Sequence, residues 1–156
     1  MMNNLLDTEK AYIAGLFDGE GCVTLTKSRN HHQPRILISN SDIRVIEWLQ
    51  TKLPFGRYKA INSKNIRNSH TVWVWALGSK DNVKLFLILI RPYLIIKADQ
   101  ADLLLSLLDA EQETIREPIT KKGPGRSFLP VDVVKRREET FNELRRLKTA
   151  NYQSIQ

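Results

Sequence analysis

Four short segments of the chain alternate between apolar and polar side chains, over residues 23–29, 35–40, 57–61 and 71–77. Successive side chains of a strand point to opposite faces, so this alternation predicts a sheet with one apolar and one polar face. Apolar residues at helical spacing predict helices over residues 8–18, 43–52, 81–91, 97–113 and 131–149. The N-cap candidates are Thr8, Asp81 and either Ser41 or Asp42, and residues 30–34 are expected to form a turn. The order predicts an α+β fold in which one four-stranded antiparallel sheet carries helices on one face.

The length of 156 residues suits one domain with a helical appendage. We expect a core over residues 1–115, followed by a basic loop and a C-terminal helix over residues 116–156. Cys22 is the one cysteine, which excludes an intramolecular disulfide framework and a multi-cysteine zinc site. The first ten residues show no signal-peptide pattern, and no apolar run could span a bilayer. We therefore expect a soluble intracellular protein with no membrane partner.

The formal net charge of +7 is unevenly distributed along the chain. Residues 24–75 carry nine basic and two acidic side chains, and residues 116–156 carry ten basic and five acidic ones. A basic surface attracts nucleic acid phosphates whatever the base sequence. On charge alone, an ordinary solvated basic surface is an equally good interpretation.

The segment IAGLFDGEG, residues 13–21, carries the most information about function. A buried amphipathic helix that ends at glycines, with stops at Gly19 and Gly21, would account for its apolar residues. It would not account for Gly15, because a glycine inside a helix costs about 1 kcal/mol relative to alanine. Gly15 and Gly19 share one helix face, and small residues at this spacing let two helix backbones approach closely. The acidic residues Asp18 and Glu20 follow at the end of the helix.

This segment resembles the signature of the LAGLIDADG homing endonucleases. The resemblance extends over about residues 8–112, through the order of elements, Pro92-Tyr93-Leu94 before Lys97, and a helix that begins near Asp99. It implies a saddle-shaped sheet and an intron-encoded, site-specific endonuclease. Such an enzyme would hydrolyse double-stranded DNA at a long, pseudo-palindromic site and leave short 3′ overhangs.

The motif occurs once in the chain, and family members with a single motif form homodimers. The resemblance therefore implies a symmetric dimer in which the motif helix packs against its twin. The side chains expected at this interface are Tyr12, Gly15, Leu16 and Gly19.

The resemblance also implies a catalytic centre that holds Mg²⁺ or Mn²⁺. The metal ligands would be the Glu20 carboxylate and the Gly19 backbone carbonyl, with Glu20 standing where many members have aspartate. Lys97 matches a lysine that would stabilise developing negative charge. Asn40 and Arg44 match residues that order water near the scissile phosphate, although a cap-side asparagine and a surface arginine are equally good interpretations. Asp18 is expected to be structural.

Base recognition is expected on the polar face of the sheet, where arginine and lysine read guanine and glutamine reads adenine. Val72 and Val74 share that face and could make apolar base contacts, whereas Trp73 and Trp75 have the opposite parity and are expected in the core. A basic loop after residue 116 is expected to contact phosphates. The predicted DNA-binding residues are Thr24, Thr26, Ser28, Arg29, Gln33, Arg35, Arg57, Lys59, Arg67, Lys121, Lys122 and Arg126.

Two other functions stay open at this stage. The same fold serves RNA maturases, which assist splicing of an intron RNA with little or no nuclease activity. Glu20 and Lys97 favour the nuclease, because a maturase could lose both. A DNA-binding regulator would need a helix-turn-helix domain, for which residues 116–156 offer too little. The expected location is that of the target DNA, a bacterial cytoplasm or an organelle.

Overall fold

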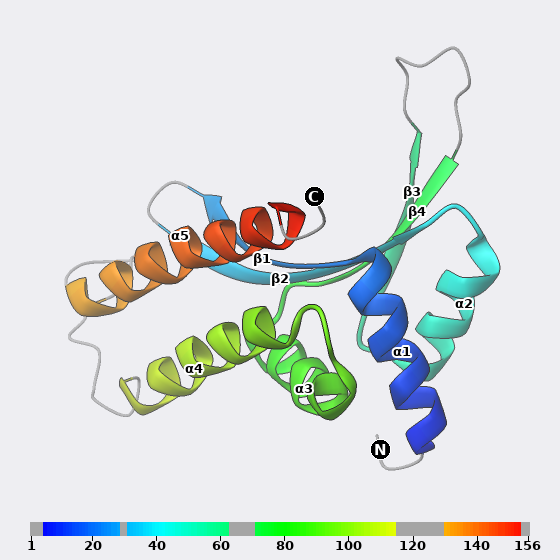
Figure 1. The fold of residues 1–156 in the computed structure, drawn as a ribbon, viewed down its shortest axis with the longest axis horizontal. Helices are drawn as coiled ribbons and strands as arrows, with labels where there is room; N and C mark the ends of the chain where they lie inside the picture. Colours follow the sequence, from blue (N-terminus) through cyan, green and yellow to red (C-terminus); the bar gives the residue numbers. More distant parts are fainter. Residues whose placement is uncertain (1–4, 29–30, 63–70, 115–129, 154–156) are drawn as a thin grey trace, which may run out of the picture.

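The computed structural model describes residues 5–28, 31–62, 71–114 and 130–153. Its four strands form one antiparallel sheet in the order β1-β2-β4-β3 (Figure 1). The strands are β1 Gly21–Ser28, β2 His31–Asn40, β3 Arg57–Asn62 and β4 Thr71–Leu77. This arrangement confirms the predicted α+β class.

The helices pack against the apolar face of the sheet and against each other. They are α1 Asp7–Glu20, α2 Ile43–Lys52, α3 Lys80–Ile90, α4 Ala98–Thr114 and α5 Val131–Gln153, with a 3₁₀ turn η1 at Arg91–Tyr93. Helix α1 packs against β1 and β2, and α2 packs against β2, β4 and β3. In Figure 1, α4 and α5 extend along β1 and β2. None of the helices in the described ranges is long and apolar enough to cross a membrane.

Strand register confirms the predicted division of the sheet into two faces. Val23 lies opposite Ile36, and Thr24 lies opposite Arg35. Val23 and Ile36 are fully buried, whereas Arg35 is exposed. Trp75 is also fully buried in the core, where its Nε1 donates a hydrogen bond of 3.1 Å to Gln50. The alternation in the sequence therefore assigned the core side of the sheet correctly.

The start of β2 differs from the prediction. The strand begins at His31 rather than at residue 35, so the turn predicted over residues 30–34 is wrong for residues 31–34. Pro34 pairs with Leu25 of β1, whereas β4 pairs with β2 only from Ile36 onward. A proline fits this part of the strand because only one side of it is paired to a neighbour.

The bounds of α1 also differ from the prediction. The helix begins at Asp7 and runs through Gly19 to Glu20, so Gly19 does not stop it. Thr8 is not its N-cap; the Glu9 carboxylate instead accepts a hydrogen bond of 3.0 Å from the backbone of Leu6. The helix ends at Gly21, where a Cβ atom would lie only 2.1 Å from the ring of Phe17. A glycine is required there for close packing.

The predictions for the caps of α2 and α3 had different outcomes. The Asp42 side chain accepts a hydrogen bond from the Arg44 backbone, which confirms its predicted role as the cap of α2. The prediction that Asp81 caps α3 is wrong, because Ser79 precedes that helix and Asp81 lies in its first turn.

Helix α5 is held to the body of the protein by buried charges. The Arg137 guanidinium donates to both carboxylate oxygens of Glu111 on α4 and to the backbone carbonyl of His32 on β2. Lys80 of α3 donates to the same carboxylate. Burial by itself raises the pKa of Glu111, but the hydrogen bonds from Arg137 and Lys80 outweigh it, so the pKa lies below its ordinary value. That the core ends at residue 115, before a basic loop and a C-terminal helix over residues 116–156, stays a prediction.

We expect Glu111→Gln to lower the free energy of unfolding by about 3 kcal/mol, because it leaves the Arg137 guanidinium buried without a carboxylate. Chemical denaturation at neutral pH measures this change. Because folding lowers the Glu111 pKa, its contribution is complete above the ordinary value of 4.5 and declines as pH falls from there through the lowered pKa of the folded protein. The two proteins should converge below that lowered pKa. Glu143→Gln, which removes the partner of Arg146 in a solvent-screened ion pair, is the control and should leave the free energy of unfolding nearly unchanged.

Candidate active site and nucleic-acid interface

The candidate active site lies where α1 ends and β1 begins. Gly19 and Glu20 are both exposed in the last turn of α1. The Glu20 carboxylate makes no hydrogen bond to any other residue in the described ranges. Its oxygens are therefore available to a ligand.

Asp18 connects the end of α1 to the segment that precedes α4. Its carboxylate accepts backbone hydrogen bonds of 2.8 Å from Ile95, 3.1 Å from Ile96 and 2.9 Å from Lys97. The residue is 9% exposed, so these amides take the place of water around a buried carboxylate. The contacts agree with the structural role expected for Asp18.

Lys97 is brought next to Glu20 by this connection. Its Nζ donates a hydrogen bond to the backbone carbonyl of Asp18. Burial lowers the pKa of Lys97, while the nearby charges of Asp18, Cys22 and Glu20 partly offset the decrease. The structure thus unites two of the predicted catalytic residues, which lie far apart in the sequence.

Asn40 and Arg44 lie at the same end of the sheet. Gly21 pairs with Ile38, so Asn40 at the end of β2 extends alongside the last turn of α1. The Asn40 side chain accepts a hydrogen bond of 2.8 Å from the backbone of Asp42. The exposed Arg44 guanidinium pairs with Asp42 and lowers the pKa of that carboxyl to about 2. In the chain alone, both side chains are thus occupied by local contacts.

The polar face of the sheet carries most of the predicted base-reading residues. Those that are exposed on it are Thr26, Gln33, Arg35, Arg57 and Lys59, with Thr24 half-buried among them. Val72 and Val74 share this face, because they pair with Ile61 and Lys59 of β3. Of Ser28 only the backbone is described, and Arg29, Arg67, Lys121, Lys122 and Arg126 lie outside the described residues.

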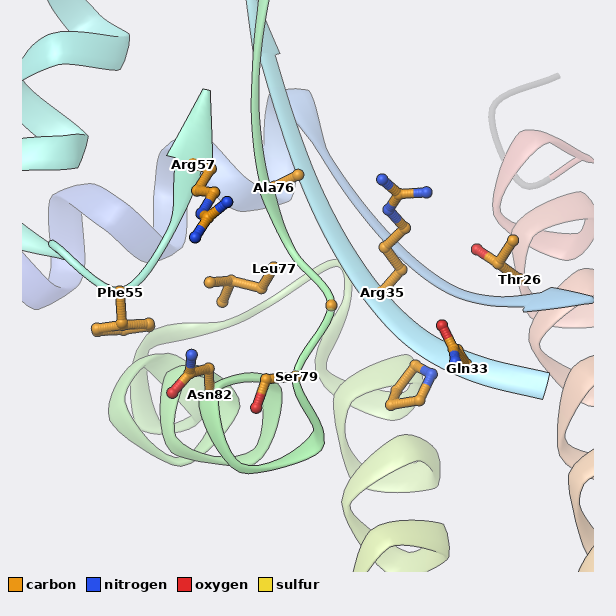
Figure 2. A pocket seen from close by; sticks show the side chains of 11 residues that line it. Thr26, Gln33, Arg35, Phe55, Arg57, Ala76, Leu77, Ser79 and Asn82 are labelled. Atoms are coloured by element: carbon orange, nitrogen blue, oxygen red, sulfur yellow. The ribbon is translucent and has the colours of Figure 1, made fainter. Parts of the chain in front are cut away.

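A hollow of about 530 Å³ lies at one end of this face (Figure 2). Arg35 of β2 and Arg57 of β3 lie on either side of β4 at its rim, and Ser79 and Asn82 enter from the start of α3. Sequence reasoning missed Ser79 and Asn82. The one available signal was their place directly after the fourth strand, which ends beside the arginines.

The predicted dimer face of α1 is open in the single chain. Tyr12 is 53% exposed, and Gly15 and Gly19 are also exposed. A Cβ atom built at Gly15 or Gly19 would meet no atom within 4 Å. Packing within one chain therefore does not explain either glycine, whereas packing against a second helix would.

The described residues of one chain do not form a metal site from side chains alone. No group of three or more histidine, cysteine or acidic side chains that could hold a metal occurs in the described part of the chain. Magnesium commonly takes only one or two carboxylates and fills its remaining positions with phosphate oxygens and water. The unengaged Glu20 carboxylate and the exposed Gly19 backbone fit that donor set.

Comparison with protein families matches residues 7–91, more than half of the chain, to the LAGLIDADG-like domain. The chain belongs to the LAGLIDADG family. No curated protein sequence matches it. The family assignment agrees with the motif at the end of α1 and with the order of helices and strands.

Solved structures show the same fold at low sequence identity. The archaeal intron-encoded homing endonuclease I-Vdi141I, complexed with DNA, is 18% identical with a TM-score of 0.67, covering 90% of this chain and 84% of that one. I-CvuI in complex with its target is 19% identical with a TM-score of 0.57, covering 88% and 94%. Meganuclease I-SmaMI, bound to DNA, is 18% identical with a TM-score of 0.57, covering 94% of this chain but only 45% of its own.

We expect Asp18→Asn to loosen the segment that carries Lys97, because an amide offers one acceptor oxygen where the carboxylate serves three amides. Hydrogen exchange at the amides of residues 95–97 should accelerate by at least about tenfold, and the free energy of unfolding should fall by about 1–3 kcal/mol. Asp81→Asn, at an exposed position in the first turn of α3, should change neither quantity. Unchanged exchange at these amides in Asp18→Asn would contradict the assigned contacts.

Proposed function

We propose that this protein is a homing endonuclease that cuts both strands of DNA at a specific site as a homodimer. The observation that carries the proposal is the convergence of Glu20 and Lys97 at the edge of a polar, basic sheet face. An exposed acid beside a half-buried lysine provides a metal ligand and a cation at one point, where a bound DNA backbone could be cut.

The sheet face supplies the second requirement, which is recognition of a particular DNA sequence. Arg35, Arg57 and Lys59 can donate to guanine edges, and Gln33 can form two hydrogen bonds with adenine. The half-buried Val72 can contact a thymine methyl group, whereas Val74, predicted to do the same, is only 8% exposed. Because these groups project from paired strands, their spacing is fixed before DNA binds.

Each candidate catalytic residue has a defined part in the proposed reaction. Glu20 and the Gly19 carbonyl would hold Mg²⁺ or Mn²⁺, which supplies an activated water and neutralises phosphate charge. The Lys97 ammonium would stabilise negative charge as the P–O bond breaks. Asn40 and Arg44 would orient water once DNA draws Arg44 away from Asp42. Products with short 3′ overhangs are expected.

A two-fold dimer would supply one such centre for each DNA strand. The open face of α1, with its two glycines, is the surface we assign to the second copy. This assignment agrees with the coverage of solved structures, since the chain spans nearly all of I-CvuI and about half of I-SmaMI. The proposed target is therefore a long site with approximate two-fold symmetry.

We expect Glu20→Gln to abolish cleavage while DNA binding persists. The test incubates the protein with Mg²⁺ and a randomised duplex library enriched in palindromes, followed by sequencing of the cut ends. The cleavage rate on the recovered duplex should fall by more than about 100-fold. Loss of a residue that only orients a metal ligand typically costs about 10–100-fold, and loss of the metal ligand itself should cost more. Asp109→Asn, on the exposed side of α4, is the control and should cut as the wild type does.

The outcome of the library experiment also separates the two main functions. Cutting at one long symmetric site supports the endonuclease. Binding of a structured RNA without cutting of any duplex would contradict it and favour the maturase. Cleavage at the wild-type rate by Glu20→Gln would contradict the assignment of the metal ligand.

We expect Gly15→Leu to dissociate the dimer without unfolding the chain. A Cβ atom at Gly15 meets no atom of its own chain within 4 Å, but a leucine there would hold two α1 helices apart. Sedimentation velocity should show a shift from dimer to monomer, and cleavage should be lost with it. Ser106→Leu places the same side chain at an exposed position of α4 and should leave a cleaving dimer. A stable Gly15→Leu dimer would refute the assigned face.

A further inference from the structure

Helices α4 and α5 form an antiparallel pair with one end at the candidate active site (Figure 1). Lys97 directly precedes α4 and is bound to the end of α1, so α4 starts at the site and leads away from it. The salt bridge between Glu111 and Arg137 joins the two helices at their far part. From there α5 leads back toward the start of α4.

The direction of α5 along β1 follows from two contacts. Near one end, Lys27 of β1 pairs with Glu138 at 3.1 Å. Near the other end, Cys22 of β1 lies 3.2 Å from the Nζ of Lys148. Lys27 and Cys22 are five positions apart in a strand, and Glu138 and Lys148 are ten positions apart in a helix. Both separations span about 15–17 Å, so the two contacts agree.

The helical period places Lys148 on the inward side of α5. Arg137, Phe141, Leu144 and Lys148 follow at spacings of four, three and four residues, which keeps them on one face. Arg137 and Leu144 are buried, and Phe141 and Lys148 are half-buried. The same stripe that packs α5 onto the sheet therefore brings Lys148 to the start of β1, beside Cys22, which lies two residues beyond Glu20.

Lys148 differs from most basic residues of α5 in having no acidic partner. Arg136, Arg137 and Arg146 each form an ion pair, with Asp132, Glu111 and Glu143 respectively. Among the described residues, no carboxylate forms an ion pair with Lys148, and its one hydrogen bond goes to the sulfur of Cys22. Within the described residues, the positive charge of the Lys148 ammonium is therefore not paired with a carboxylate.

The ammonium groups of Lys97 and Lys148 lie near each other at this point of the fold. Lys148 is near enough to Lys97 that its charge adds to the decrease of the Lys97 pKa that burial causes. Like charges repel, so holding both on one side of the Glu20 turn costs folding free energy. An anion bound between them would reverse that cost, and the phosphates of DNA are anions that the proposed function brings there.

We propose that Lys148 is a second lysine of the catalytic centre and that its ammonium binds a phosphate oxygen of the DNA strand being cut. This proposal rests on the proposed function and adds to it a residue from a helix outside the matched domain. Lys97, just before α4, and Lys148, on α5, would both contact the phosphate near Glu20 at the end of α1.

The test compares Lys148→Met and Lys148→Gln, which remove the charge, with Lys148→Arg, which keeps it. The matched control is Lys84→Met, because Lys84 pairs with Asp109 at 2.6 Å on the helical side of the molecule. The probe is the duplex recovered from the library experiment. Two quantities are measured: the single-turnover cleavage rate at saturating protein, and the salt dependence of binding in the Glu20→Gln background, where DNA stays intact.

The neutral variants should cleave about 100-fold more slowly than the wild type at saturating protein. A dimer would lose two phosphate contacts, so the slope of log K against log salt should become shallower by about 1.8. Lys148→Arg should retain most of both properties, and Lys84→Met should match the wild type. Thermal unfolding of each variant shows whether the fold is intact, and the glutamine variant replaces the methionine one if the latter unfolds.

Several outcomes would overturn the proposal for Lys148. A wild-type rate and slope in the folded neutral variants would do so while leaving the endonuclease proposal standing. A slower rate with an unchanged slope and no recovery in Lys148→Arg would show a purely structural role. If the wild type binds duplex DNA without cutting it, the proposed function fails, but the salt slope still decides whether Lys148 binds phosphate. If it binds no duplex, both proposals fail.

Discussion

The Asp18 carboxylate is the contact on which the rest of the site depends. It replaces its lost hydration with three backbone amides from residues 95–97, and so ties the end of α1 to the start of α4. That one connection places Lys97 beside Glu20 and fixes the point from which α4 leaves the site. The position of α5 follows, because α5 is paired with α4 through a buried ion pair. The two acids of the motif thus differ in role. Asp18 holds the site together, and Glu20 is the acid left available for a ligand.

The protein uses its charges in two distinct ways. Glu111, Arg137 and Lys80 are joined in a buried network that fixes helices to one another, and their charges are satisfied within the chain. Lys97, Lys148 and the arginines of the polar sheet face are not matched in this way. Unmatched cations create a positive potential that favours a polyanion over any small neutral ligand. The acidic residues at the end of α1 interrupt that potential where the proposed metal ion would bind.

Much of the fold could be predicted because its signals are local. The alternation of Val23, Leu25, Ile36 and Ile38 determines which side of the sheet is buried, and no long-range information is needed to read it. The IAGLFDGEG segment likewise identified the family that the domain comparison then showed. The errors lie where a tertiary contact overrides a local preference. Pro34 is typical of a turn, but it is accommodated in β2, where it pairs with β1 alone. Gly19 is typical of a helix end, but α1 continues past it to Gly21, where the Phe17 ring leaves no room for a side chain.

The sequence by itself determined the α+β class, the two faces of the sheet, and the presence of Glu20 and Lys97 as candidate catalytic residues. It could do so because side-chain periodicity and a contiguous motif are properties of neighbouring residues. Only the tertiary structure decided that Asp18 holds the segment before Lys97, that Ser79 and Asn82 border the hollow beside Arg35, and that Lys148 lies next to Cys22. These are contacts between residues far apart along the chain, and their existence depends on helix directions that are set by burial and charge pairing rather than by local sequence.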